Sequence, residues 1–164
     1  PDWEYWLAPD GTYRYISPAC ARLTGYESDA FLADPDLLLR LIYPSDREPW
    51  IRHLQEILGN EGMTPDKDCL EFRIRSRDGQ ERWIEHICSP VVTEDGRYLG
   101  RRGVNRDITE RKHFEEELKR SEDFLNVTGH MAKVGGWEVD ATTHAVRWTR
   151  GTHELFEMAP EGTP

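Results

Sequence analysis

Hydrophobic and polar residues alternate through much of the stretch at 70–112, which contains three runs typical of β-strands. Leu70, Phe72 and Ile74 alternate with charged residues, the period of two expected of a strand with one solvent-facing side. An Asp-Gly pair, which tolerates the positive φ of a tight turn, stands after each of the first two runs: Asp78-Gly79 and Asp95-Gly96. The pattern predicts an antiparallel three-stranded meander.

The residues before the meander predict a hairpin followed by several helices. Asp10-Gly11 joins two aromatic-rich runs, so we expect a hairpin of the same kind there. Ser17 before Pro18 is typical of a helix N-terminus, with Ser17 as the capping residue, and Gly25 ends that short helix. Further helices are expected at 28–32, 37–43 and 45–58.

Charge makes nucleic acid an improbable partner. The chain has 164 residues, with 21 basic against 31 acidic side chains and a net charge of −10. We interpret its one basic cluster as strand and edge positions where charge blocks edge-to-edge aggregation: Arg97, Arg101, Arg102 and Arg106.

Cysteine usage indicates a reducing, cytoplasmic setting. Cys20, Cys69 and Cys88 are an odd number without CxxC spacing, and we expect them to be small buried or half-buried residues. No run approaches the ~18 apolar residues of a membrane span, and no signal peptide follows Pro1, so we expect no membrane contact in this segment. Any membrane anchor of a parent protein would lie elsewhere.

A charged helix is predicted after the meander, over residues 110–126. Thr109 is its expected N-cap, and acidic residues fill its first turns. A narrow apolar seam runs along it at spacings of 4, 3 and 4: Phe114, Leu118, Ser121 and Leu125. The seam predicts parallel pairing of two such helices in a homodimer; the alternative is a solvated spacer, because the seam is barely two heptads long.

Catalytic patterns are missing from the sequence. It contains no GxSxG, no glycine-rich phosphate loop with lysine, no HExxH and no CxxC. The six histidines are dispersed without metal-ligand spacing. We therefore expect neither an enzyme nor a metal site in these residues.

Taken together, these features resemble a PAS domain with a C-terminal PAC motif. The matching segments, in order, are Asp10-Gly11, Tyr15–Ala19, Leu23–Tyr26, Tyr43–Asp46, Phe72-Arg73, Asp78-Gly79, Trp83-Ile84, Asp95-Gly96 and Gly103–Thr109. One departure is Tyr43, where the family commonly has histidine. The resemblance implies an α+β fold, with a five-stranded antiparallel sheet, a helical insert and a C-terminal connector helix.

The resemblance also implies a pocket between insert and meander. Its candidate lining is largely apolar: Leu39, Ile42, Trp50, Leu54, Ile57, Phe72, Ile74, Ile84, His86 and Val104. Core packing alone also explains these residues. The cofactor stays unassigned, because the Asn-Cys-Arg-Phe-Leu-Gln run of flavin photosensors is absent, and His53, the position matching a haem ligand, is expected to be exposed beside Arg52.

The C-terminal residues echo the first ones, at an offset of 132 from Tyr15 onward. Gly136–Asp140 and Val146–Thr149 repeat the pattern of the opening hairpin, and the tail resembles the start of a second PAS domain. The alternative is a hairpin appendage of the first domain. The predicted organisation is a sensor domain at 1–109, a connector helix at 110–126 and a PAS-like fragment at 127–164.

The resemblance implies a sensory module of a bacterial signalling protein, either a sensor histidine kinase or a cyclic-dinucleotide enzyme. A small-molecule ligand or a partner would be sensed in the first domain. Asp107, Ile108 and Thr109 would relay the change into the connector helix and on to an output domain. The alternative is a dimerisation and spacer module without a ligand.

Overall fold

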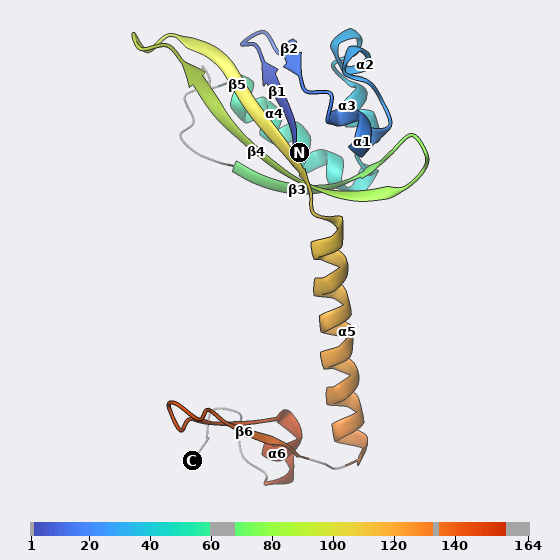
Figure 1. Cartoon of the computed structure of the whole chain (residues 1–164), viewed down its shortest axis with the longest axis vertical. Helices are drawn as coiled ribbons and strands as arrows, with labels where there is room; N and C mark the ends of the chain where they lie inside the picture. Colours follow the sequence, from blue (N-terminus) through green and yellow to red (C-terminus); the bar gives the residue numbers. More distant parts are fainter. Residues whose placement is uncertain (1, 60–67, 133–134, 157–164) are drawn as a thin grey trace. The chain divides into compact units, whose positions relative to one another are not determined.

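The computed structural model describes residues 2–59, 68–132 and 135–156 (Figure 1). The chain divides into two units, Pro1–Lys112 and His113–Pro164. The first unit contains a five-stranded sheet with helices, and the second begins inside a long helix and continues into a small hairpin.

The sheet of the first unit is antiparallel throughout and runs in the order β2-β1-β5-β4-β3. Its strands are β1 (Trp3–Leu7), β2 (Tyr13–Ile16), β3 (Asp68–Arg75), β4 (Glu81–Val92) and β5 (Tyr98–Asp107). The predicted meander is confirmed as β3, β4 and β5, and the predicted first hairpin as β1 and β2. The α+β fold with a five-stranded antiparallel sheet is therefore confirmed.

Helices fill the connection between β2 and β3. They are α1 (Cys20–Thr24), α2 (Ser28–Ala33), α3 (Leu37–Leu41), the 3-10 turn η1 (Pro44–Asp46) and α4 (Arg47–Gly59). Ser17 does not cap α1, because its hydroxyl accepts the backbone N–H of Glu4 at 2.9 Å and so ties β2 to β1. The expected Ser17 cap was wrong for this reason.

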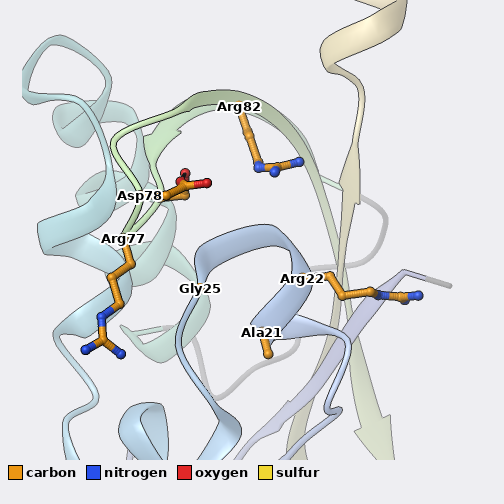
Figure 2. A pocket seen from close by; sticks show the side chains of 7 residues that line it. Ala21, Arg22, Gly25, Arg77, Asp78 and Arg82 are labelled. Carbon is orange, nitrogen blue, oxygen red and sulfur yellow. Dashed lines mark hydrogen bonds between the residues drawn. The ribbon is translucent and has the colours of Figure 1, made fainter.

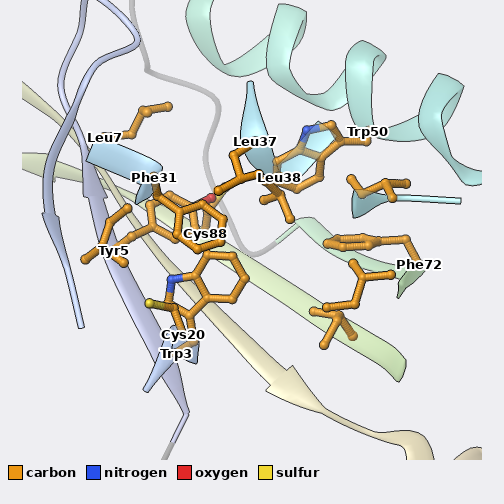
Figure 3. Close-up of a cluster of buried hydrophobic side chains, with 14 of the residues drawn as sticks. Trp3, Tyr5, Leu7, Cys20, Phe31, Leu37, Leu38, Trp50, Phe72 and Cys88 are labelled. Carbon is orange, nitrogen blue, oxygen red and sulfur yellow. The ribbon is translucent and has the colours of Figure 1, made fainter. Parts of the chain in front are cut away.

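The hydrophobic core lies between these helices and one face of the sheet (Figure 3). Trp3 from β1 packs against Phe31 from α2, with ring centroids 5.0 Å apart. Trp50 from α4 meets Phe72 from β3 edge-on at 5.1 Å. These large rings are at most 2% exposed, so the core joins the helical insert to both ends of the sheet.

The outer edge of β3 is covered by the helical insert. Tyr43 donates its backbone N–H to the carbonyl of Arg73 at 3.0 Å, and the Arg73 N–H donates to Asp46 Oδ2 at 3.0 Å. The Arg73 guanidinium also holds Asp46, at 2.9 and 2.7 Å. Side-chain hydrogen bonds from Arg73 lower the pKa of Asp46 to about 2. At Arg73 the edge of β3 is therefore unavailable for pairing with another chain.

The basic cluster was assigned to edge positions, and the structure corrects that assignment. Arg97 precedes β5, and the other three arginines lie on β5, which is the central strand of the sheet; Arg101 points inward with 1% exposure. Arg102 and Arg106 lie on the opposite face, where Arg102 pairs with Glu4 and Arg106 pairs with acidic neighbours.

The second unit contains most of helix α5 (Thr109–Ala132), strands β6 (Trp137–Val139) and β7 (Val146–Trp148), and helix α6 (Arg150–Leu155). Helix α5 continues past the expected end at residue 126, so the residues at 127–132 are helical. No helix among the described residues has both the length and the apolar character needed to cross a membrane.

We expect replacement of Asp46 by asparagine to destabilise the first unit by about 1 kcal/mol at neutral pH, since solvent screens a half-buried pair. An ionised Asp46 stabilises the fold above the unfolded carboxyl pKa near 4, and that contribution fades as the pH falls toward 2. Urea unfolding of both proteins between pH 5 and pH 2 should show the difference shrinking. A difference in the free energy of unfolding that stays constant over this pH range would show that the ionised Asp46 carboxylate does not stabilise the fold.

Candidate functional site

Polar side chains meet inside the core of the first unit, centred on His86. The Nδ1 atom of His86 lies 2.8 Å from Asn105 Oδ1, and its Nε2 atom lies 3.5 Å from the hydroxyl of Tyr5. All three residues are at most 2% exposed. Because an amide oxygen only accepts, His86 must donate from Nδ1, and its Nε2 atom keeps a lone pair.

His53 from α4 joins this cluster. Its ring lies 5.1 Å from that of His86, and its Nε2 atom lies 3.4 Å from Cys88 Sγ. One ligating atom from each of His53, His86 and Cys88 falls within 4.8 Å of the others, and all three residues are buried. The expectation of an exposed His53 was wrong, because the helix face that carries Trp50 also turns His53 toward the sheet.

Strand pairing places these side chains together. Side chains alternate across a strand, so Ile84, His86 and Cys88 share the inner face of β4. In the register, His86 lies opposite Asn105, and Cys88 lies opposite Gly103. On the other side of β5, Gly103 faces Tyr5. A Cβ atom at Gly103 would come within 2.2 Å of the Tyr5 ring, so glycine makes room for that ring.

The His86 imidazole is uncharged at neutral pH. Burial lowers the pKa of His86 to about 3, although the hydrogen bond with Asn105 acts in the opposite direction. Nearby His53 and the Arg101 guanidinium lower this pKa further. Burial also raises the pKa of Tyr5 well above its usual range. The interior therefore presents a neutral imidazole and a neutral phenol at physiological pH.

A second constellation lies where β5 becomes α5. Ile108 donates its backbone N–H to the carbonyl of Trp83 at 2.9 Å, and the Trp83 N–H donates to the Thr109 hydroxyl at 3.0 Å. Asp107 Oδ1 accepts the Thr109 N–H at 2.9 Å, and Asp107 Oδ2 pairs with Arg82. Burial raises the pKa of Asp107, but the hydrogen bonds from Thr109 and Arg82 outweigh it and lower the pKa overall.

Thr109 was expected to cap the helix. Instead, its hydroxyl accepts the backbone N–H of Trp83 in β4, while the Asp107 carboxylate accepts the first helical N–H. Ile108, between them, is 5% exposed. The start of α5 is thus bonded to the sheet through Asp107 and Thr109, the residues on either side of Ile108.

The first turn of α5 also bonds to the outer face of the sheet. Arg111 pairs with Glu71 at 2.8 Å and with Glu85 at 3.4 Å. Lys112 pairs with Glu71 at 2.5 Å and lies over the Trp83 ring at 5.1 Å. These contacts attach residues 109–112 to β3 and β4.

Beyond that turn, the seam of α5 faces solvent. Phe114, Leu118 and Leu125 are each between 62 and 69% exposed, and Ser121 is exposed as well. Large apolar side chains at this spacing form a continuous stripe along a helix. The structure therefore leaves the predicted pairing surface open.

A surface pocket of about 340 Å³ lies beside α1 and the turn between β3 and β4 (Figure 2). It is lined by Ala21, Arg22, Gly25, Ser76, Arg77, Asp78 and Arg82. Its charged side chains are engaged with the protein: Arg77 lies over the Tyr26 ring at 5.5 Å, and Arg82 pairs with Asp107 at 3.1 Å. It is separate from the buried cluster.

Most of the residues predicted to line a pocket do meet in the core. Those that are fully or partly buried in the hydrophobic core are Leu39, Ile42, Trp50, Leu54, Ile57, Phe72, Ile74, Ile84 and His86. Val104 is not among them. It is the neighbour of Asn105 in β5, and because side chains alternate along a strand it lies on the outer face of the sheet. Sequence reasoning missed Tyr5, Cys88 and Asn105 as members of this cluster, because only the strand pairing of the folded sheet brings them near His86.

The cysteines differ from one another. Cys20 and Cys88 are buried, as expected, whereas Cys69 is exposed. The expectation for Cys69 was wrong: it lies near the start of β3, opposite Ile87, and is exposed.

Comparisons with known proteins place the chain among signalling modules. A family model described as "PAS fold" matches residues 6–105. A blue-light-activated histidine kinase of Brucella anthropi is 25% identical over 93% of this chain. The chain spans about a third of the length of that kinase, 32%.

Two solved structures share the fold. A sensory box histidine kinase/response regulator from Burkholderia thailandensis is 26% identical, with a TM-score of 0.55, covering 76% of this chain and 89% of that one. A PAS domain from Colwellia psychrerythraea is 28% identical, with a TM-score of 0.52, covering 66% and 87%.

We expect Asn105→Leu to destabilise the first unit by about 1–3 kcal/mol, because His86 Nδ1 loses its buried acceptor. Adding His86→Phe should restore part of this loss, since an apolar pair leaves no polar group unpaired. Urea unfolding of the wild type, both single variants and the double variant gives the coupling energy. Strictly additive losses would show that the hydrogen bond contributes nothing.

Proposed function

The chain belongs to the PAS fold family, and on that premise we propose that it is a sensory and regulatory module that relays a change in its first unit through Asp107, Ile108 and Thr109 into α5. The observation that carries this proposal is the pairing of β4 with β5. In that register His86 lies opposite Asn105, and Ile84 lies opposite Asp107.

The buried cluster and the helix anchor therefore occupy the same two strands. Two residues along a strand correspond to about 7 Å. Any event that moves His86 or Asn105 acts on strands whose next residues are bonded to the start of α5. A ligand or partner that prefers one arrangement of these strands would bias the helix, because differential binding shifts such an equilibrium.

The parent protein is proposed to be a sensor histidine kinase or a cyclic-dinucleotide enzyme. The similarity to histidine kinases of Brucella anthropi and Burkholderia thailandensis supports the first. Light activation is not carried over from the first of these relatives, because the Asn-Cys-Arg-Phe-Leu-Gln run is absent from this sequence. The module itself would be regulatory, with catalysis in an output domain.

Parallel pairing of α5 with a second copy would give the module its dimeric output. Its seam of Phe114, Leu118, Ser121 and Leu125 is exposed. Helix α5 has 24 residues, so the 4-and-3 spacing continues to Thr128 and Ala132 and approaches three heptads. The observed helix length thus supports pairing over a solvated spacer.

The tail at 135–156 is proposed to begin a second PAS repeat. An offset of 132 residues relates the pair Tyr5 and Ile16 to the pair Trp137 and Trp148, which have the same register. The hydrogen bond from Glu4 N–H to Ser17 recurs from the Gly136 N–H to the Thr149 hydroxyl, at 2.8 Å. Matching side-chain bonds at one offset support a repeat over an unrelated appendage.

A module that only dimerises and spaces is the second candidate. The close ring contacts among Trp50, Phe72 and His86 favour it, because they fill the region where a ligand was expected. The polar cluster distinguishes the two candidates, since a spacer has no use for costly buried polar groups. A ligand that binds the folded state must raise its melting temperature.

We expect Thr109→Ala to lower amide protection at 110–118 by about fivefold, equivalent to ~1 kcal/mol, because the Trp83 N–H loses its acceptor. Thr109→Ser keeps the hydroxyl and should keep the protection. Hydrogen exchange followed by mass spectrometry measures both. Unchanged exchange in Thr109→Ala would show that the hydrogen bond between Trp83 and Thr109 does not hold the start of α5 in place.

We expect Leu118→Glu to raise the dissociation constant of the dimer at least about tenfold, because two buried leucines are lost from the seam. Asn126→Glu adds the same charge off the seam and serves as the matched control. Size-exclusion chromatography with light scattering gives the masses. A wild-type chain that stays monomeric at high concentration, or equal shifts in both variants, would refute the pairing.

A further inference from the structure

Three buried side chains of the first unit bring metal-ligating atoms together. His53 comes from α4, and His86 and Cys88 come from the inner face of β4. We infer that these three residues bind one divalent metal ion of the zinc class inside the core. The strands and helix bring them together although their sequence spacing resembles no metal motif.

The distances fit a tetrahedral ion. The ligating atoms all lie within 4.8 Å of one another, and Cys88 Sγ lies 3.4 Å from His53 Nε2. Zinc-to-sulfur and zinc-to-nitrogen bonds of about 2.3 and 2.0 Å separate two tetrahedral ligands by about 3.5 Å. Two of the three ligands therefore already stand at a coordination distance from each other, and a small ring movement completes the set.

Asn105 holds His86 in the form that a metal requires. Its Oδ1 atom accepts the hydrogen bond from Nδ1, so Nε2 is the nitrogen that keeps a lone pair for a metal ion. A ligating histidine in metalloproteins ordinarily donates its other N–H to such an acceptor, which fixes the ring. The Tyr5 hydroxyl, 3.5 Å from Nε2, is the candidate fourth ligand.

Charge makes Cys88 the decisive ligand. The Arg101 side chain is buried on the same inner face of β5 as Asn105, and its positive charge opposes a cation bound by neutral groups alone. Cys88 offsets this by binding as a thiolate: a metal–sulfur bond forms, the thiol proton goes to solvent, and no electron is transferred. A serine at this position would leave the ion's two charges unbalanced.

The ligand types define the class of ion. Two imidazoles and a thiolate suit zinc, cobalt, nickel or copper, whereas magnesium and calcium prefer oxygen ligands. Cobalt(II) is a spectroscopically visible substitute for zinc in the same geometry. The site extends the proposed sensing role by naming the ligand class, but metal binding is measured on its own and does not depend on α5 or on dimer formation.

The test is a titration of the full, reduced, metal-free chain with cobalt(II), followed by displacement with zinc(II). We expect one equivalent to bind, with a thiolate-to-cobalt charge-transfer band in the near ultraviolet, and zinc to raise the melting temperature. Cys88→Ser should abolish the band, and His53→Gln should weaken binding at least about tenfold. Cys20→Ser, another buried cysteine, and Cys69→Ser, the exposed one, should leave the band unchanged.

Absence of the band in the wild-type chain, or its persistence in Cys88→Ser, would overturn the site. Loss of the band in Cys69→Ser would do the same, because it would assign binding to the surface. Circular dichroism confirms that each variant is folded, and Cys88→Ala replaces Cys88→Ser if the serine variant is not. The Thr109 and Leu118 variants contain all three ligands, so failure of the metal site and failure of the relay give different results.

Discussion

The hydrogen bond between His86 and Asn105 is the constraint on which the interior of the first unit depends. It joins the two longest strands at their inner faces, and both partners are 0% exposed. A buried polar group without its partner costs about 1–3 kcal/mol, so this pair penalises any other arrangement of β4 against β5. A slip of one residue would turn Asn105 to solvent and bring Val104 inward.

That same register explains why the interior and the helix are close. The strands that hold the pair continue by two residues to Ile84 and Asp107, where the sheet ends and α5 begins. Thr109 and Asp107 attach the helix on one side, while Arg111 and Lys112 attach it to acidic residues of the outer face. The two strands are thereby bonded directly to the first turn of the helix.

Local patterns predicted the strands, the turns and the start of the long helix, because alternation, Asp-Gly pairs and helix signals are properties of neighbouring residues. The buried cluster could not be found in this way. Asn105 and Arg101 are polar residues on the inner face of β5, and only the pairing of β5 with β4 and β1 reveals which face is inner. His53 was misjudged although it lies three residues after Trp50 on the same face of α4, where the His86 ring of β4 also covers it.

A comparison of the β1–β2 hairpin with the β6–β7 hairpin shows which features come from the local sequence and which come from tertiary packing. The two hairpins share two cross-strand residue pairs and a side-chain hydrogen bond at the same offset, so these features follow from the hairpin sequences themselves. Burial does not follow from them. Tyr5 is 2% exposed because β5 and the helices of the first unit cover it, whereas its counterpart Trp137 is 71% exposed. The local hydrogen bonds thus define the hairpin, and the central strand and helical insert are what convert its aromatic face into a core.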